Sequence, residues 1–235
     1  MAFSKELVDA VDKTDAIVAD FDGTLCRGNF IRALCFQQLR RARQEHDYTG
    51  LFRGALDAAK ISLMLKPLKG KEAHDAKGVQ LAYQALARLN LDRDDIRKYA
   101  IKYVLENAIP ETQKLLVRFA SKPKFLATLQ GSTMAQVAAA HFDLNGGVSN
   151  VELFDKRDRL HGINIVMSNA QQKFELSSGQ LRSQGIALEK CAVVGDGLCD
   201  KKLLEKALVS IAPTSAVPEI LNVAKFHMEV SRNPS

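Results

Sequence analysis

The sequence predicts an α/β protein with a Rossmann-like parallel sheet core and an inserted all-helical cap domain. Short apolar runs without polar alternation, typical of buried parallel strands, occur at residues 15–20 and then only after residue 123. The long stretch between them is predicted to be almost entirely helical. Strands and helices thus alternate on both sides of a helical block. We therefore predict a catalytic core of residues 1–25 and 123–235, and a cap of residues 26–122.

The first half of the chain contains one strand among helices. A short helix is expected over residues 3–13, followed by the strand of residues 15–20, DAIVAD. The cap is predicted to contain helices over residues 29–45, 50–65, 72–89, 92–107 and 110–121. Their limits are set by helix-breaking residues: Gly50, Pro67 with Gly70, Asn90 and Pro110.

The second half returns to strands. KFLATL (124–129) is a predicted strand, and a helix is expected over residues 133–142. Two β-like runs, 148–154 and 159–167, are separated by DKRD, which indicates a hairpin turn. The remaining expected elements are a helix over 170–184, a strand in CAVVGDG, a helix over 199–208 and a last short strand over 209–213.

Composition indicates a soluble globular protein of the cytoplasm. The chain has 235 residues, of which 46% are hydrophobic and 26% charged. No apolar run reaches the roughly 18 residues that a membrane span needs, and the N-terminal residues have no apolar signal-peptide core. The four cysteines, Cys26, Cys35, Cys191 and Cys199, form no CxxC pair. Reduced thiols in a reducing compartment are the expected state.

Positive charge is concentrated in the predicted cap. The net charge is +6, with +9 in residues 27–122 and −3 in the remainder. A basic surface can steer anionic ligands toward a cleft, or bind nucleic acid or a membrane surface, or simply face solvent. We expect a small anionic substrate, and we consider a nucleic-acid partner the weaker interpretation.

Four aspartates are expected to meet at one edge of the sheet. Asp20 and Asp22 follow the first strand, and Asp196 and Asp200 follow the CAVV strand. Ligands of such folds bind beyond the carboxyl ends of the strands. Several like charges in one cleft favour a divalent cation, and Mg²⁺ prefers hard oxygen ligands together with water and phosphate. The alternative, helix N-capping by each aspartate, does not account for both motifs together.

The spacing of Asp20 and Asp22 suits phosphoryl transfer. Residues i and i+2 of an extended segment point the same way. A carboxylate can attack phosphorus to form an aspartyl-phosphate, and a second carboxyl group can protonate the leaving oxygen and then activate water. Gly23 and Thr24, at the following turn, offer backbone N–H groups for a phosphate.

Two further side chains complete the predicted site. Thr128 ends the KFLAT strand with a hydroxyl that can donate to a phosphate oxygen. Lys173 begins the helical stretch before the last motif, and an ammonium can neutralise charge on a transferring phosphoryl group.

In these residues the sequence resembles the haloacid dehalogenase (HAD) superfamily of hydrolases, in its phosphoserine-phosphatase-like branch. DFDGTL (20–25) matches the first motif, FLATLQGS (125–132) resembles the second, Lys173 fits the third and VVGDGLCD (193–200) resembles the fourth. The order and spacing agree over roughly residues 15–215.

The resemblance implies a Rossmann-like core with a helical cap and a Mg²⁺-dependent reaction. It implies that Asp20, the backbone carbonyl of Asp22, and Asp196 hold the metal, with Asp200 in support. It also implies phosphate contacts from Asp20, Thr128 and Lys173. Members that cleave carbon–halogen bonds lack the second aspartate of the first motif, so the presence of Asp22 favours phosphate chemistry.

Three positions depart from the pattern of the phosphoserine phosphatases. Asn29 occupies the region where those enzymes carry a glutamate for the substrate ammonium. Gln130 stands where the second motif usually has glycine, and Cys199 stands where asparagine is common. The first departure argues against phosphoserine as the substrate, and the second predicts a side chain that changes the shape of the site.

The sequence therefore predicts a Mg²⁺-dependent phosphatase that hydrolyses a small organic phosphomonoester through an aspartyl-phosphate. Alternatives are a phosphotransferase or a nucleotidase using the same residues, or a non-catalytic binding module with a basic cap. We expect cap residues to recognise the leaving group, and the sequence contains no motif that identifies these residues.

Overall fold

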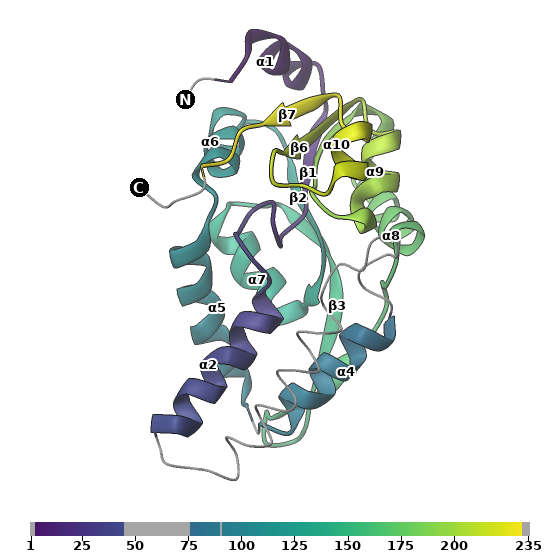
Figure 1. The fold of residues 1–235 in the computed structure, drawn as a ribbon. Coiled ribbons are helices and arrows are strands. Elements are labelled where there is room, and N and C mark those ends of the chain that lie inside the picture. The colour runs from purple at the N-terminus through teal and green to yellow at the C-terminus, as the bar shows by residue number, and fades with distance from the viewer. Residues whose placement is uncertain (1–2, 45–75, 90, 232–235) are drawn as a thin grey trace.

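The fold is described from a computed structural model, which covers residues 3–44, 76–89 and 91–231 (Figure 1). Within these ranges the chain forms a seven-stranded sheet in the order β4-β3-β2-β1-β5-β6-β7. All neighbouring strands pair in parallel except β3 and β4, which form an antiparallel hairpin. The strands are β1 (Ala16–Ala19), β2 (Lys124–Gly131), β3 (Gly146–Phe154), β4 (Leu160–Asn164), β5 (Cys191–Val194), β6 (Val209–Pro213) and β7 (Phe226–Met228).

Strand β1 lies at the centre of the sheet and positions the site. All four of its residues are buried, as expected of a parallel strand covered on both faces. Val18 pairs with Phe125 of β2 on one side and with Val193 of β5 on the other. The carboxyl ends of β1, β2 and β5 therefore lie side by side at one edge.

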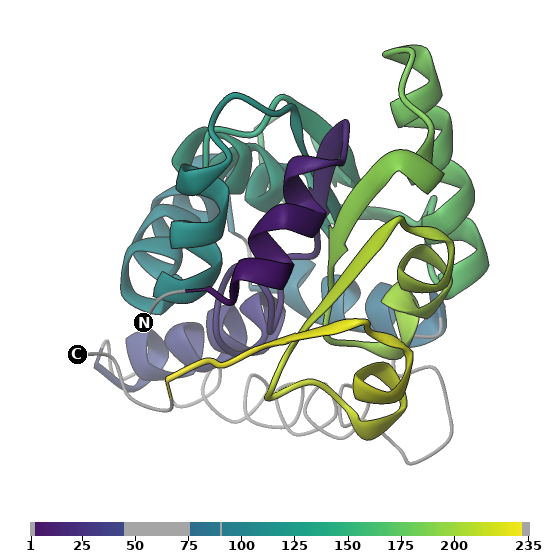
Figure 2. The ribbon, with the colours of Figure 1, turned by 90° about the horizontal axis from the view of Figure 1, so that it is seen from above.

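Helices cover both faces of the sheet, as Figure 2 shows from above. One face packs against α1, α2, α4, α5, α6 and α7, and the other packs against α8, α9 and α10. The helices are α1 (Lys5–Asp12), α2 (Phe30–Gln44), α4 (Ala76–Ala87), α5 (Arg93–Asn107), α6 (Pro110–Arg118), α7 (Ser132–His141), α8 (Ala170–Ser183), α9 (Lys201–Lys206) and α10 (Pro218–Val223).

Local capping chemistry sets several helix starts. Ser4, Asp92 and Asn169 each accept a backbone N–H of the first turn, at the starts of α1, α5 and α8. Pro110 occupies the first position of α6, where its missing N–H costs nothing. These residues lie within three positions of the predicted helix starts.

The described helices between residues 30 and 118 share one hydrophobic cluster with the sheet. Phe30 of α2, Tyr103 of α5 and Leu115 of α6 belong to the same buried cluster as Ile17 of β1. Helix α5 packs against α7, and α4 packs against β4. The boundaries of the cap at residues 26–122 stay a prediction, and the predicted helix of residues 50–65 lies outside the described residues, as does the start of the helix of residues 72–89.

The predicted elements within the described residues are present, with differences at several ends: α6 stops at Arg118 instead of residue 121, and β3 begins at Gly146 instead of residue 148. Strand β2 continues two residues further than predicted, to Gly131, and β4 ends at Asn164 instead of residue 167. The strand of residues 209–213 is not the last one, because α10 and β7 follow it. Strand β7 has only three residues and no apolar run, so periodicity could not reveal it.

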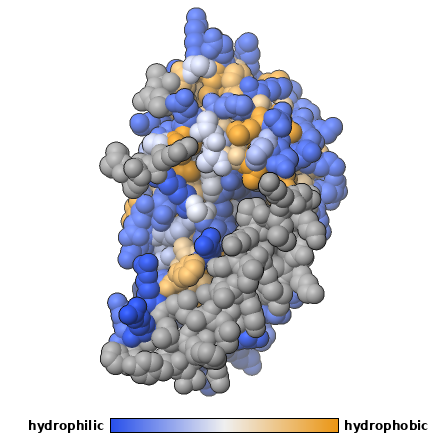
Figure 3. Space-filling model, viewed as in Figure 1, coloured by the Kyte–Doolittle hydropathy of each residue, from blue (hydrophilic) through white to orange (hydrophobic). Residues whose placement is uncertain are grey.

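On the face drawn in Figure 3 the coloured surface is mainly hydrophilic, with hydrophobic side chains in small separate groups. Scattered apolar exposure of this kind is normal for a globular surface. Among the described residues, no helix combines the length and the apolar composition that crossing a membrane requires.

The sheet predicts a strong effect of one glycine. An added Cβ at Gly147 would lie 2.5 Å from the backbone oxygen of Leu126 on the neighbouring strand. Because neither strand can move freely, we expect Gly147→Ala to lower the free energy of unfolding by about 2 kcal/mol. At Gly146 the nearest atom would be at 3.6 Å, so Gly146→Ala is the matched control. Urea midpoints measure both, and equal midpoints for the two variants would contradict the packing described.

Candidate active site

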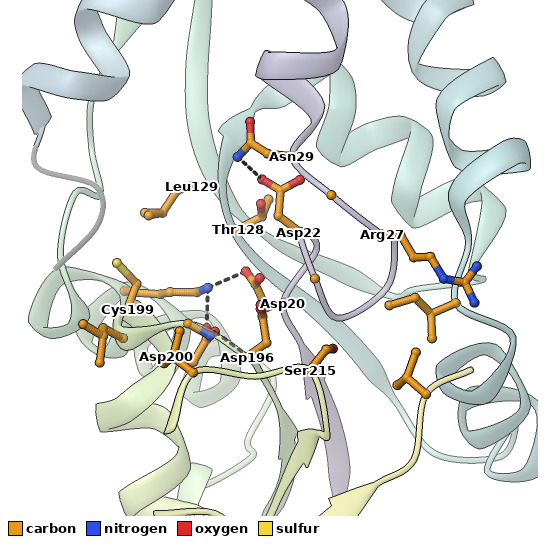
Figure 4. A pocket seen from close by; sticks show the side chains of 18 of the residues that line it. Asp20, Asp22, Arg27, Asn29, Thr128, Leu129, Asp196, Cys199, Asp200 and Ser215 are labelled. Carbon is orange, nitrogen blue, oxygen red and sulfur yellow. Dashed lines mark hydrogen bonds and ion pairs between the residues drawn. The ribbon is translucent and has the colours of Figure 1, made fainter. Parts of the chain in front are cut away.

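The predicted residues from four distant segments line one cavity of about 510 Å³ at the carboxyl edge of the sheet (Figure 4). Asp20 follows β1, Thr128 lies in β2, and Asp196 follows β5. The predicted residues that line the cavity are Asp20, Asp22, Gly23, Thr128, Lys173, Asp196 and Asp200. The strand-edge prediction therefore brings together all the predicted residues except Thr24, which is buried behind them.

Lys173 lies between two carboxylates. Its Nζ is 2.5 Å from Asp20 Oδ1 and 2.6 Å from Asp200 Oδ1, and the residue is 1% exposed. Burial alone would lower the pKa of the ammonium, but the charges and hydrogen bonds of Asp20 and Asp200 outweigh it and raise the pKa. Lys173 is therefore a fixed positive charge next to Asp20.

Asp200 holds two parts of the site in place. Its Oδ1 accepts from Lys173, and its Oδ2 accepts the backbone N–H groups of Asp196 (3.2 Å) and Gly197 (3.0 Å). A Cβ on Gly195 would lie 2.6 Å from Asp200, so the turn after β5 can close only around a glycine. Asp200 thus orients both the lysine and the loop that carries Asp196.

The acidic residues form a group that suits a divalent cation. Asp20, Asp196 and Asp200 each offer a carboxylate oxygen, and these oxygens lie within 4.8 Å of one another. Burial and then Asp200 raise the pKa of Asp20 to about 7, in spite of Lys173. Burial and then Asp20 and Asp200 raise the pKa of Asp196 well above its usual range. Because burial and then the neighbouring carboxylates disfavour ionisation of these groups, and hard carboxylate oxygens suit Mg²⁺, the donor set fits such an ion.

The side chain of Asp22 lies apart from that group. Its Oδ2 accepts from Asn29 Nδ2 (2.9 Å) and from Gln130 Nε2, and its Oδ1 accepts the N–H of Phe30 (3.1 Å). Burial raises the pKa of Asp22 to about 6, against the opposing hydrogen bonds from Phe30 and Gln130. A carboxyl group in this range can be protonated or ionised near neutral pH, which suits an acid and base. Its backbone carbonyl as a metal ligand stays a prediction.

Gly23 brings the first and fourth motifs into contact. Its φ is +75°, and an added Cβ would lie 2.1 Å from Asp196 Oδ2. Thr24 Oγ1 donates to Asp196 Oδ1 at 3.2 Å. The N–H groups of Gly23 and Thr24 donate within their own loop, to the carbonyls of Cys26 and Phe21. A phosphate contact from these two amides, as predicted, would require them to exchange those partners.

Thr128 has its hydroxyl proton available. Its Oγ1 accepts the backbone N–H of Gln130 at 3.1 Å, which orients the hydroxyl, and its own proton has no acceptor among the described residues. Thr128 is 2% exposed and lines the cavity. This geometry agrees with the predicted donation to a phosphate oxygen.

The structure adds cavity residues that the sequence did not reveal. They are Gly28, Ile109, Leu129, Gly197, Leu198, Ser215, Val217, Val230 and Ser231. Ser215 follows β6, so the strand-edge rule could have indicated it. Val230 and Ser231 come from the C-terminal segment, where Arg27 donates to the backbone oxygen of Ser231 at 3.0 Å. No local sequence pattern predicts this contact between Arg27 and Ser231.

The sequence matches no protein-family model and no curated protein. Solved structures match over most of the chain. A phospho-aspartyl intermediate analogue of a phosphoserine phosphatase has a TM-score of 0.67 at 18% identity, covering 92% of this chain and 94% of that one. A protein of unknown function from Bordetella pertussis has a TM-score of 0.69 at 15% identity, covering 91% and 97%. A HAD family hydrolase from Salmonella enterica has a TM-score of 0.64 at 17% identity, covering 92% and 67%.

The chain therefore has the fold of the phosphoserine-phosphatase-like proteins of the HAD superfamily. This confirms the Rossmann-like α/β core expected from the sequence resemblance. The site residues rest on the sequence motifs and on the geometry above, because likeness at these identities establishes the fold alone.

The acidic group predicts a stabilising substitution. Because burial and the neighbouring carboxylates raise the pKa of Asp196 in the folded chain, this group makes folding less favourable at neutral pH, where an aspartate of the unfolded chain is ionised. Asp196→Asn removes the titratable group and keeps an acceptor for Thr24. We expect the melting temperature in EDTA to rise by about 2–4 °C, the shift that 1 kcal/mol produces in a domain of this size.

Asp200→Asn is the matched comparison for Asp196→Asn. It removes a carboxylate that holds Lys173 and two backbone N–H groups, so we expect it to lower the melting temperature. A fall in melting temperature for Asp196→Asn in EDTA would contradict the electrostatic description.

Proposed function

We propose that the protein is a Mg²⁺-dependent phosphatase that hydrolyses a small organic phosphomonoester, with Asp20 as the nucleophile. The observation that carries the proposal is the position of Asp20. Its Oδ1 is held by Lys173 at 2.5 Å, and its carboxylate lies within 4.8 Å of the other two acidic groups, in a cavity at the carboxyl edge of the sheet. One carboxylate oxygen is thereby fixed, and the other is left to react.

In the proposed first step, a carboxylate oxygen of Asp20 attacks phosphorus and the ester P–O bond breaks. Asp22 gives its proton to the leaving oxygen, which departs as an alcohol. Lys173 and the hydroxyl of Thr128 stabilise negative charge on the phosphoryl oxygens. In the second step Asp22, now ionised, takes a proton from a water molecule that attacks phosphorus, and Asp20 is released with inorganic phosphate.

Asp20, Asp196 and the backbone carbonyl of Asp22 would hold the metal, with Asp200 in support. When bound, Mg²⁺ supplies positive charge for the phosphoryl oxygens and for the crowded carboxylates. The raised pKa values of Asp20 and Asp196 support this fit, because a bound Mg²⁺ would stabilise the ionised carboxylates and lower both pKa values.

The remaining expectations fit the same proposal. Helices of the predicted cap, residues 26–122, would exclude water and select the leaving group. A small anionic phosphomonoester is the proposed partner, in preference to nucleic acid. The four cysteines all lie among the described residues as buried thiols without disulfides, which supports a cytoplasmic location.

The direct activity test is release of phosphate from p-nitrophenyl phosphate, in Mg²⁺ and in EDTA. We expect turnover by the wild type in Mg²⁺ only, and a loss on the order of 10⁴-fold or more in Asp20→Asn, because the nucleophile is removed. Asp9→Asn, on the exposed face of α1, is the control and should retain wild-type rates.

Two outcomes of this assay are decisive. Undiminished turnover in EDTA or in Asp20→Asn would contradict the proposal. If p-nitrophenyl phosphate is inert, the same assay is repeated on a panel of cellular phosphate esters, and silence there would favour a non-catalytic binding module.

Metal binding has a readout that does not depend on turnover. A ligand that binds only the folded chain at 100 times its dissociation constant stabilises it by about 2.7 kcal/mol. We therefore expect Mg²⁺ to raise the melting temperature of the wild type and to have much less effect on Asp196→Asn. Equal shifts in the two proteins would mean that Mg²⁺ does not bind at this acidic group.

A further inference from the structure

Two side-chain amides hold the Asp22 carboxyl group. Asn29, just before α2, donates its Nδ2 to Asp22 Oδ2 at 2.9 Å, as the dashed line in Figure 4 marks. Gln130, near the end of β2, donates its Nε2 to the same oxygen. Within the part of the chain that the structure describes, Oδ1 receives one donor, the N–H of Phe30 at 3.1 Å. Because Oδ2 already accepts from two side chains, Oδ1 is the oxygen with a position open for a proton.

Gln130 is an unusual residue for its surroundings. It is 2% exposed, and its Oε1 is buried without a hydrogen-bond partner among the described residues. A buried acceptor without a partner lowers stability, so such atoms in folded proteins call for an explanation. The hydrogen bond from the other end of the same amide to Asp22 provides one.

The backbone around Gln130 is fixed on three sides. Its own N–H donates to Thr128 Oγ1 at 3.1 Å, and the carbonyl of the preceding residue accepts from Asn150 Nδ2 at 2.8 Å. The N–H of the following residue donates to the hydroxyl of Tyr83 at 2.8 Å. The amide of Gln130 therefore reaches Asp22 from a rigid base, as positioning of a reactive group requires.

We propose that Gln130 and Asn29 are positioning residues for protonation of the leaving group. This inference rests on the proposed function and assigns a role to two residues at which the chain departs from the phosphoserine-phosphatase pattern. They hold the Asp22 carboxyl so that Oδ1 exchanges the proton. As the ester P–O bond breaks, the proton moves from Oδ1 to the leaving oxygen, and the three N–H donors stabilise the carboxylate that forms.

Leaving-group dependence separates this role from a structural one. A p-nitrophenolate leaves readily without a proton, whereas phenol and alkyl alcohols depend on the acid. We would measure kcat/KM for substituted aryl phosphates, phenyl phosphate and an alkyl phosphate, in saturating Mg²⁺. In Gln130→Met, which keeps the length of the side chain but cannot donate, we expect a loss of about 10-fold or less for p-nitrophenyl phosphate and on the order of 10²-fold for the alkyl ester.

Two further variants calibrate the series. Asp22→Asn cannot supply the proton and gives the steepest dependence on the leaving group. Asn29→Ala removes the second amide, lies at a partly exposed position, and should steepen the dependence in the same direction as Gln130→Met. If Gln130→Met does not fold, as judged by its circular dichroism, Asn29→Ala decides the question.

The outcomes distinguish the two proposals. Suppose that the wild type is active and that Gln130→Met and Asn29→Ala lose the same fraction of kcat/KM for every substrate, or lose none. That result overturns the positioning role and leaves the proposed phosphatase intact. A wild type that hydrolyses no member of the series and no ester of the cellular panel overturns the phosphatase and this role together. A loss that grows as the leaving group becomes poorer supports the positioning role.

Discussion

The site depends on the buried ammonium of Lys173, which lies between Asp20 and Asp200 at 2.5 and 2.6 Å. A charge 1% exposed is tolerated only with partners, and removing one partner of a buried pair costs about 3–5 kcal/mol. Lys173 therefore ties helix α8 to the ends of β1 and β5. Through Asp200 it also fixes the turn that carries Asp196.

The acidic residues that suit a metal ion also reduce the stability of the folded chain. Burial and mutual repulsion raise the pKa values of Asp20 and Asp196 above those of unfolded aspartates, so these groups reduce the stability of the folded chain at neutral pH. The packed sheet on either side offsets this cost, with Ile17 and Ala192 fully buried in neighbouring strands. An acidic cluster held by a rigid core is what a site that recruits a cation requires.

Much of this architecture could be predicted from the sequence, because strand signals and motif positions are local. The rule that parallel strands end at one edge placed Asp20, Thr128 and Asp196 together. The contacts of Asp22 could not be predicted, since Gln130 lies 108 residues away and spacing carries no information on such hydrogen bonds. Strand β7 and the placement of Ser231 were missed because neither has a periodic pattern.

The central claim is that Asp20 becomes phosphorylated during turnover. It is tested most directly by quenching the enzyme in acid during hydrolysis of p-nitrophenyl phosphate, reducing it with borohydride and sequencing the peptides by mass spectrometry. Borohydride reduces an acyl phosphate to an alcohol, so we expect homoserine at position 20. Unmodified Asp20 in an enzyme that is turning over, or modification of another carboxylate in its place, would contradict it.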